Sequence, residues 1–176
     1  MCFIIRTLFY HEPLTLRELS KLANCSLSKT SRKIEELNKE GLVSVSVKGR
    51  AYLLRANLQH PLLKYILLRE EAEYTALTLK KYPELVELLE ELLKKCDGEI
   101  VLLFGSYARH EATDTSDVDV AVINGKGGEF NLSYEEFRKL MKNKNNTMMS
   151  IIKHHVIVKG FEKFIDEVMK WKTKKG

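Results

Sequence analysis

The sequence predicts a two-domain α/β protein of the α+β kind, with a helical first domain that ends in a hairpin, a helical connector and a second domain built on a small mixed sheet. Helical spacing of apolar residues runs up to Gly41, after which apolar residues recur at every second position, as in a strand. The apolar run at 99–104 and the alternating run at 118–123 are typical of buried strands. These runs predict a separate sheet in the second half of the chain.

Charge divides the chain in a similar way. Residues 1–58 carry ten Lys and Arg against five Asp and Glu, whereas residues 59–176 carry 19 of each. An excess of positive charge in one domain favours a polyanionic partner there. We therefore expect domains at 1–58 and 97–176, separated by a helical connector at 59–96 that begins beside a His-Pro boundary.

The first domain is expected to begin with two helices. Residues 1–11 are mostly apolar and are closed off by Pro13, which predicts a buried helix. Thr15, followed three residues later by Glu18, has the spacing of a capping box, so a second helix should begin there. The expected core-facing stripe of this helix is Leu16, Leu19, Leu22 and Ala23.

A third helix and a hairpin complete the first domain. Ser28 is expected to cap the helix and Gly41 to end it. Valines then alternate with polar residues over 43–48, and a basic turn around Gly49 leads to a return strand at 51–54. The sequence therefore predicts three helices followed by a β-hairpin.

Composition and spacing also predict the remaining elements. Helices are expected at 62–82, 84–95, 134–142 and 161–171, and further strands at 130–132 and 155–158. The stretch 143–146 is expected to be a polar loop. Trp171 shares its helical spacing with Phe164, Ile165 and Val168, which favours a place in the core over a surface that stacks bases.

The segment SLSKTSRKIEELNKEGLV, followed by the hairpin, resembles the recognition-helix region of winged helix-turn-helix regulators. The resemblance implies that the start of the third helix enters the major groove of double-stranded DNA, while the hairpin tip reaches phosphates or the minor groove. The DNA-binding residues that it implies are Ser28, Lys29, Thr30, Arg32, Lys33, Lys48 and Arg50. A protein-interaction module with a charged, solvated helix is the alternative.

The segment LLFGSYARHEATDTSDVDVAVI resembles the minimal nucleotidyltransferase domain of the DNA polymerase β superfamily. In that pattern Gly105 lets the backbone approach a triphosphate, and Ser106 and Arg109 bind its phosphates. Two aspartates two residues apart on a strand project from one face. The resemblance therefore implies Asp117 and Asp119 as catalytic residues that hold Mg²⁺ or Mn²⁺.

Two features leave the family pattern incomplete. His110 stands where the family often has Gly. Active members also carry a third carboxylate on a neighbouring strand, for which Glu129 and Asn131 are the candidates. An amide cannot act as a base, so Glu129 is the expected third catalytic acid.

The two resemblances imply a DNA-binding protein that transfers a nucleoside monophosphate from an NTP, expected to be ATP, to an unidentified acceptor hydroxyl. Two alternatives stay open: a transcriptional regulator whose nucleotidyltransferase domain is a nucleotide sensor or inactive, and an antitoxin-like enzyme that AMPylates a toxin. The expected partners are double-stranded DNA, an NTP and a protein acceptor or toxin, and the connector helices could support a homodimer.

Cysteine and hydropathy patterns complete the expectations. Cys2, Cys25 and Cys96 show neither a disulfide framework nor metal-ligand spacing, so we expect reduced thiols in the cytoplasm. No apolar run reaches the roughly 18 residues of a membrane span, and no small-residue cleavage site follows the apolar first residues.

Overall fold

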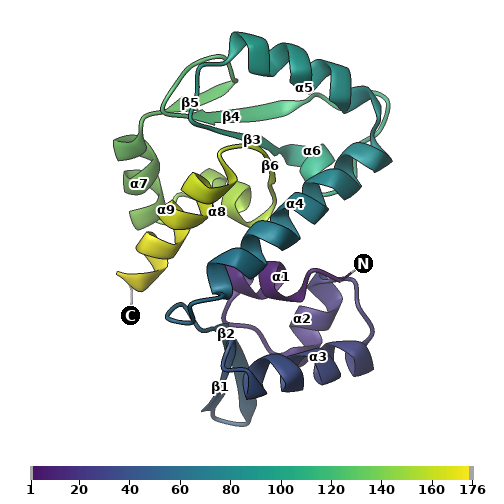
Figure 1. The fold of residues 1–176 in the computed structure, drawn as a ribbon, viewed down its shortest axis with the longest axis vertical. Helices are drawn as coiled ribbons and strands as arrows, with labels where there is room; N and C mark the ends of the chain where they lie inside the picture. Colours follow the sequence, from purple (N-terminus) through teal and green to yellow (C-terminus); the bar gives the residue numbers. More distant parts are fainter. Residues whose placement is uncertain (1, 175–176) are drawn as a thin grey trace. The chain divides into compact units, whose positions relative to one another are not determined.

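The computed structural model describes residues 2–174, which form two compact units, one up to Glu70 and one from Glu71 onward (Figure 1). The division falls within the helix α4 (Leu63–Lys81). Residues 59–96, expected as a connector, are therefore shared between the two units. Helices and small sheets occur in both units, which confirms the predicted α+β class.

The first unit has three helices followed by a hairpin, in the predicted order. Its elements are α1 (Ile4–His11), α2 (Leu16–Leu22), α3 (Leu27–Lys39), β1 (Val43–Lys48) and β2 (Ala51–Ala56). The strands pair antiparallel, with Lys48 opposite Ala51 at the tip. Leu14 extends the hairpin by pairing with Leu54, so the segment between α1 and α2 is tied to the sheet.

Local capping explains where the helices of this unit begin. The predicted capping box of α2 is present, because the Glu18 carboxylate accepts the Thr15 backbone N–H at 2.7 Å and the Thr15 hydroxyl accepts the Glu18 N–H at 3.3 Å. The cap of α3 is Ser26, whose hydroxyl accepts the Lys29 N–H at 3.4 Å. The prediction of Ser28 as the cap was therefore wrong by two residues, since two serines at suitable spacing compete for this position.

Burial in the first unit corrects the predicted stripe of α2 and shows the surroundings of β1. Leu19 is fully buried, but Leu22 is 47% exposed and does not belong to the core-facing stripe. In β1 only Val43 is buried, whereas Val45 and Val47 are exposed. The alternation of valines in β1 therefore marks a strand that projects into solvent, and it does not mark a covered face.

The second unit is built on a four-stranded mixed sheet of order β5-β4-β3-β6. In it β3 pairs antiparallel with both β4 and β6, and β4 pairs parallel with β5. Besides the end of α4, its elements are α5 (Glu84–Lys95), β3 (Ile100–Phe104), α6 (Gly105–Ala108), β4 (Asp119–Ile123), β5 (Phe130–Leu132), α7 (Tyr134–Lys142), α8 (Asn146–Lys153), β6 (Val156–Lys159) and α9 (Phe161–Thr173).

Helices cover both faces of this sheet (Figure 1). On one face, Leu85 and Leu89 of α5 pack in a buried cluster with alternate residues of the strands, among them Leu103 and Val120. On the other, Phe137 of α7 and Phe164 of α9 are fully buried with ring centroids 6.3 Å apart. The strand alternation thus gives two separate hydrophobic layers.

The helix α8 was not predicted, because its start was assigned to a polar loop. Asn145 caps it, with its side-chain oxygen accepting the Met148 N–H at 3.1 Å. Met148, Ile151 and Ile152 are buried at helical spacing. Burial of this short apolar stripe, together with the cap, outweighs the polar composition of the stretch before it.

The cysteines also differ from expectation. Cys2, before α1, and Cys25, before α3, form a disulfide with their Cα atoms 5.8 Å apart, so these two are not the reduced thiols that we expected. The spacing of 23 residues carries no disulfide signal by itself, because only the packing of the helices brings these ends together. Cys96 is free and buried. Among the described residues, no helix is long and apolar enough to cross a membrane.

Candidate functional site

A cleft of about 480 Å³ lies in the second unit, where β3 turns into α6. The start of β4 and the helix α8 also contribute to it. The residues that line it are Phe104, Gly105, Arg109, Asp119, Asn146, Thr147, Ser150, Ile151 and His154. Three of the residues predicted for the site, Gly105, Arg109 and Asp119, therefore share one cavity.

Gly105 and Asp119 are in direct contact, and this contact explains the glycine. Phe104 and Asp119 form the last residue pair of the β3–β4 ladder, so the chain turns into α6 directly beside the aspartate. Gly105 has φ +71°, and a Cβ atom at this position would overlap the Asp119 carboxylate. Only glycine suits both the backbone conformation and the space.

Asp117 does not lie on the strand, which corrects the prediction that both aspartates are strand residues. The strand β4 begins at Asp119, because β3 ends opposite it and offers no partner further back. Asp117 is exposed in the preceding loop, after a turn in which the Thr113 N–H donates to the Ser116 hydroxyl at 2.9 Å. Only Asp119 of the two lines the cleft, so Asp117 reaches a shared metal only from the loop.

The two predicted phosphate ligands are placed differently. Arg109 lines the cleft and is held by an ion pair from its Nε to the Glu111 carboxylate at 2.9 Å. Its side chain keeps 39% of its surface exposed, so the guanidinium remains accessible. Ser106 is half-buried in α6, and its carbonyl accepts the Glu111 N–H at 2.9 Å.

His110 adopts a left-handed backbone conformation, with φ +61°. Glycine adopts this conformation without strain, which suits a position where the family pattern often has Gly. Its ring is stacked on Tyr74, with ring centroids 5.1 Å apart and planes 10° apart. Its Nε2 lies 2.8 Å from the Thr78 hydroxyl. These contacts fix the imidazole and offset part of the backbone strain at this non-glycine residue.

Two more hydrogen bonds connect the end of α4 to the α6 segment. The Tyr74 hydroxyl donates to the Ala108 carbonyl at 2.8 Å, and the Lys81 ammonium donates to the His110 carbonyl at 2.7 Å. Carbonyls at the end of a helix need such partners. Side chains of α4 therefore stabilise the α6 segment beside the cleft. These α4 residues precede the segment 102–123 that carries the nucleotidyltransferase resemblance.

The predicted third acid does not lie in the cleft. Glu129 is exposed in the turn before β5, and continuing the parallel register of β4 and β5 would place it beside Val120, on the face opposite Asp119. Asn131 is a structural residue, because its amide exchanges hydrogen bonds with the Gly128 backbone at 3.0 and 2.6 Å. Within residues 2–174, no three His, Cys, Asp or Glu side chains cluster to hold a metal ion.

One wall of the cleft is polar and was not predicted from the sequence. It is formed by α8 and by His154, which directly follows α8. Asn146, Thr147 and Ser150 contribute polar side chains, and His154 follows at the helix end. The adjacent His155 is buried, with its Nε2 3.4 Å from the Glu71 carboxylate. The signal that could have found this wall is the cap residue Asn145 ahead of apolar residues at helical spacing.

Comparison with known families supports one of the two resemblances. Residues 86–172 match the model of the family Polymerase beta, Nucleotidyltransferase, and this stretch includes the whole sheet and the cleft-lining residues. No curated protein and no solved structure gave a significant match. Residues 86–172 of the second unit are therefore similar to a nucleotidyltransferase family.

The residues predicted to bind DNA lie on α3 and at the hairpin tip of the first unit. All of them are at the surface except Thr30, which is fully buried and donates its hydroxyl to the Ser26 carbonyl at 3.0 Å. Thr30 is therefore a core residue of α3 and is not available to a ligand. Lys33 pairs with Glu36 at 3.2 Å, while Lys48 and Arg50 are exposed around the tip.

Proposed function

We propose that the second unit transfers a nucleoside monophosphate from an NTP, most simply ATP, to an acceptor hydroxyl with release of pyrophosphate. The observation that carries the proposal is the contact of the Gly105 turn with Asp119 in a cleft that also holds Arg109. Backbone without a Cβ, a carboxylate and an accessible guanidinium are the groups that a metal-bound triphosphate requires. The family match over 86–172 supports the same reaction.

The residues fit a Mg²⁺ ion that is completed by its substrate. Mg²⁺ in phosphoryl-transfer sites is commonly held by one or two carboxylates together with phosphate oxygens and waters. Asp119 in the cleft and Asp117 in the loop before it would supply the carboxylates, and Mn²⁺ suits the same oxygen ligands. The ion would neutralise charge on the triphosphate and on the attacking oxygen.

The residues of this chain then have distinct tasks. Arg109 compensates phosphate charge at the wall formed by α6, and the polar residues of α8 offer hydrogen bonds to the opposite side of the substrate. With Glu129 outside the cleft, the imidazole of His154, which lines the cleft, is our candidate to accept a proton from an acceptor hydroxyl. We therefore assign the role of general base to His154 and withdraw it from Glu129.

A nucleotide sensor is the second candidate, and the position of Glu129 outside the cleft favours it. A site with two carboxylates can bind a metal–nucleotide complex while transfer is slow or absent, in which case the protein reports nucleotide levels. An antitoxin-like enzyme that AMPylates a toxin is a special case of the transferase, with a protein side chain as the acceptor.

We propose further that the first unit is a winged helix-turn-helix domain that binds double-stranded DNA. The support is the order of three helices and a hairpin, with Lys29, Arg32 and Lys33 exposed in the early turns of α3. Lys48 and Arg50 at the hairpin tip add positive charge at the end of a projecting strand pair. Charge on a helix start and on a wing is what groove and phosphate contacts require.

Two measurements on the full chain test the enzyme against the sensor. Calorimetry with ATP and Mg²⁺ should show metal-dependent binding, and radiolabelled ATP incubated with the protein and candidate acceptors should give a labelled product. Tight metal-dependent binding without any transfer supports the sensor. If neither metal nor Asp119 affects binding, the assignment of the cleft is wrong.

A further inference from the structure

A second cavity of about 570 Å³ lies in the same unit between α7 and α9, and it shares no lining residue with the cleft. Its lining residues are Arg138, Met141, Lys142, Glu167, Lys170, Trp171 and Lys174. A volume of this size is typical of sites for small organic ligands. The cavity therefore has room for a ligand of nucleotide size.

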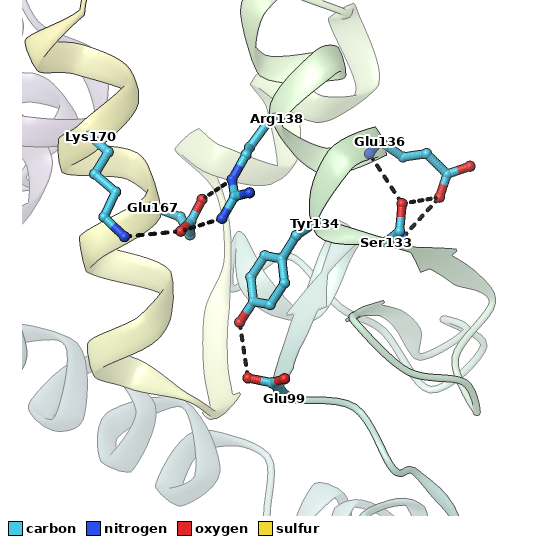
Figure 2. Close-up of polar contacts among 7 residues, drawn as sticks. All are labelled: Glu99, Ser133, Tyr134, Glu136, Arg138, Glu167 and Lys170. Carbon is cyan, nitrogen blue, oxygen red and sulfur yellow. Dashed lines mark hydrogen bonds and ion pairs between the residues drawn. The ribbon is translucent and has the colours of Figure 1, made fainter.

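The charge of this cavity is strongly positive. Four of its seven lining residues are Lys or Arg and one is Glu. Arg138 and Lys170 both contact Glu167, with Arg138 binding its carboxylate through two nitrogens at 2.6 and 2.9 Å and Lys170 lying 3.3 Å away (Figure 2). These hydrogen bonds, that of Arg138 first, hold the pKa of Glu167 below its usual value, so the pair stays ionised at neutral pH.

The ion pairs with Glu167 engage two of the four cations that line the cavity and leave the other two for a ligand. The side chain of Glu167 is only 7% exposed, so the carboxylate is used internally and is not a surface acid that would repel an anion. Within residues 2–174, neither Lys142 nor Lys174 forms an ion pair. Both line the cavity and are exposed, so an anion can reach them.

Trp171 gives the cavity an aromatic wall. Its helical spacing predicted a core position, and Phe164, Ile165 and Val168 are indeed buried, but Trp171 is only half-buried and lines the cavity. Met141 adds an apolar surface. An indole beside lysines is a suitable surface for a base that carries phosphate, because bases stack on aromatic rings while cations hold the phosphate.

From these features we propose that the cavity between α7 and α9 binds a phosphorylated nucleoside, with its base against Trp171 and its phosphate at Lys142 and Lys174. The ligand is either a free nucleotide or the phosphorylated end of a nucleic-acid strand, since both present the same chemistry. Binding here needs no metal, because protein cations already balance the phosphate. The proposal does not depend on the function proposed for the cleft.

The test uses the full chain, in which Trp171 is the only tryptophan and so reports directly on the cavity. ATP titrated in the presence of EDTA should quench the indole fluorescence saturably, and an Asp117→Asn, Asp119→Asn variant should give the same curve. That variant separates this site from the cleft: loss of the EDTA-resistant signal in it would overturn the proposal without touching the proposed transfer reaction.

A matched pair of variants tests the cations. Lys142→Gln with Lys174→Gln should weaken ATP binding by roughly tenfold, as expected for two partly exposed charge contacts. Lys139→Gln with Lys159→Gln removes the same charge from exposed positions outside the cavity and should leave the affinity unchanged. Equal losses in both variants would mean a diffuse charge effect and would overturn the site.

Competition identifies the ligand class. A 5′-phosphorylated single-stranded tetranucleotide that displaces ATP with higher affinity assigns the cavity to a strand end, whereas weaker displacement assigns it to free nucleotides, and both results support the proposal. Tripolyphosphate competing as well as ATP would show that the base contributes nothing, which contradicts the role of Trp171. Absence of quenching at millimolar ATP would also overturn the proposal.

Discussion

The two units differ in the balance of their charges and in how these charges are arranged. Residues 1–70 contain 12 Lys and Arg against six Asp and Glu, and residues 71–176 contain 17 against 18. In the first unit the candidate cations stand exposed on α3 and the hairpin. In the second, cations and acids line cavities of defined volume. The first arrangement suits an extended polyanion and the second suits individual phosphate groups.

Two buried glutamates, one in each unit, also differ in their electrostatic surroundings. Glu70 and Glu167 are 9% and 6% exposed. Burial raises the pKa of Glu70 to about 7, and the hydrogen bond from the Arg6 backbone N–H at 2.8 Å and the charges of Arg69 and Arg6 offset only part of this rise. The hydrogen bonds from Arg138 and Lys170 lower the pKa of Glu167 instead. The pKa values of the two carboxylates therefore shift in opposite directions, with burial dominant at Glu70 and hydrogen bonds from cationic side chains dominant at Glu167.

The largest expected effect concerns salt. If the five cations predicted to bind DNA, which are Lys29, Arg32, Lys33, Lys48 and Arg50, contact phosphates, raising salt from 50 to 200 mM should weaken binding of duplex DNA by roughly 10²- to 10³-fold, because condensed counterions are released. Fluorescence anisotropy with the full chain measures this. Binding of ATP with Mg²⁺ in the cleft should change far less over the same range. Undetectable DNA binding even at low salt would remove the DNA role.

Gly105→Ala should weaken Mg²⁺-dependent ATP binding by roughly 100-fold, because the new Cβ combines backbone strain with overlap on the Asp119 carboxylate. Gly49→Ala is the matched control. Gly49 also has positive φ, at +61°, but a Cβ there meets no atom within 4 Å. Calorimetry on both variants compares them, and equal losses of ATP affinity would exclude a special role for the contact.

Asp117→Asn with Asp119→Asn should weaken metal-dependent ATP binding by roughly 30-fold while the fold stays intact. Removing two like charges relieves repulsion in the metal-free protein, so its melting temperature should hold or rise. Calorimetry and thermal denaturation give the two readouts. Because only Asp119 lines the cleft, the single Asp119→Asn variant should account for most of the loss. A larger effect of Asp117→Asn alone would contradict the geometry.

Within the first unit, Arg32→Ala should reduce DNA affinity by about tenfold and Lys39→Ala by much less. Both residues are exposed, but Arg32 lies in the early turns of α3 and Lys39 is its last residue. Anisotropy at one fixed salt concentration compares them. Equal losses would mean that charge, and not the start of α3, determines binding.

Local signals were sufficient to predict most elements of the fold from the sequence. The Thr15–Glu18 capping box and the end of α3 at Gly41 follow from neighbours within four residues, and the structure contains both. The third acid and the cleft wall formed by α8 depend on sheet register and on packing between distant segments. No local rule encodes that Phe104 is the last partner of β4, although this fact alone leaves Asp117 in a loop.

The smallest expected effect concerns Glu70 and tests the contrast between the buried glutamates. Its folded pKa of about 7 lies above the ordinary value of 4.5, so the unfolded chain ionises first as pH rises. The stability that Glu70 contributes is therefore complete below pH 4.5 and is lost as pH rises through 7. The whole shift corresponds to about 3 kcal/mol, and water penetration on ionisation should reduce the observed loss to on the order of 1 kcal/mol.

Glu70→Gln should remove this part of the pH dependence, because an amide does not titrate. Urea denaturation at pH 4.5 and pH 7.5 measures the free energy of unfolding of both proteins. Glu167→Gln is the matched comparison and should act in the opposite sense: its carboxylate stabilises the fold when ionised, so the variant should lose stability mainly at pH 7.5. If Glu70→Gln and Glu167→Gln change the pH dependence in the same direction, hydrogen bonds from cationic side chains do not decide the behaviour of these buried acids.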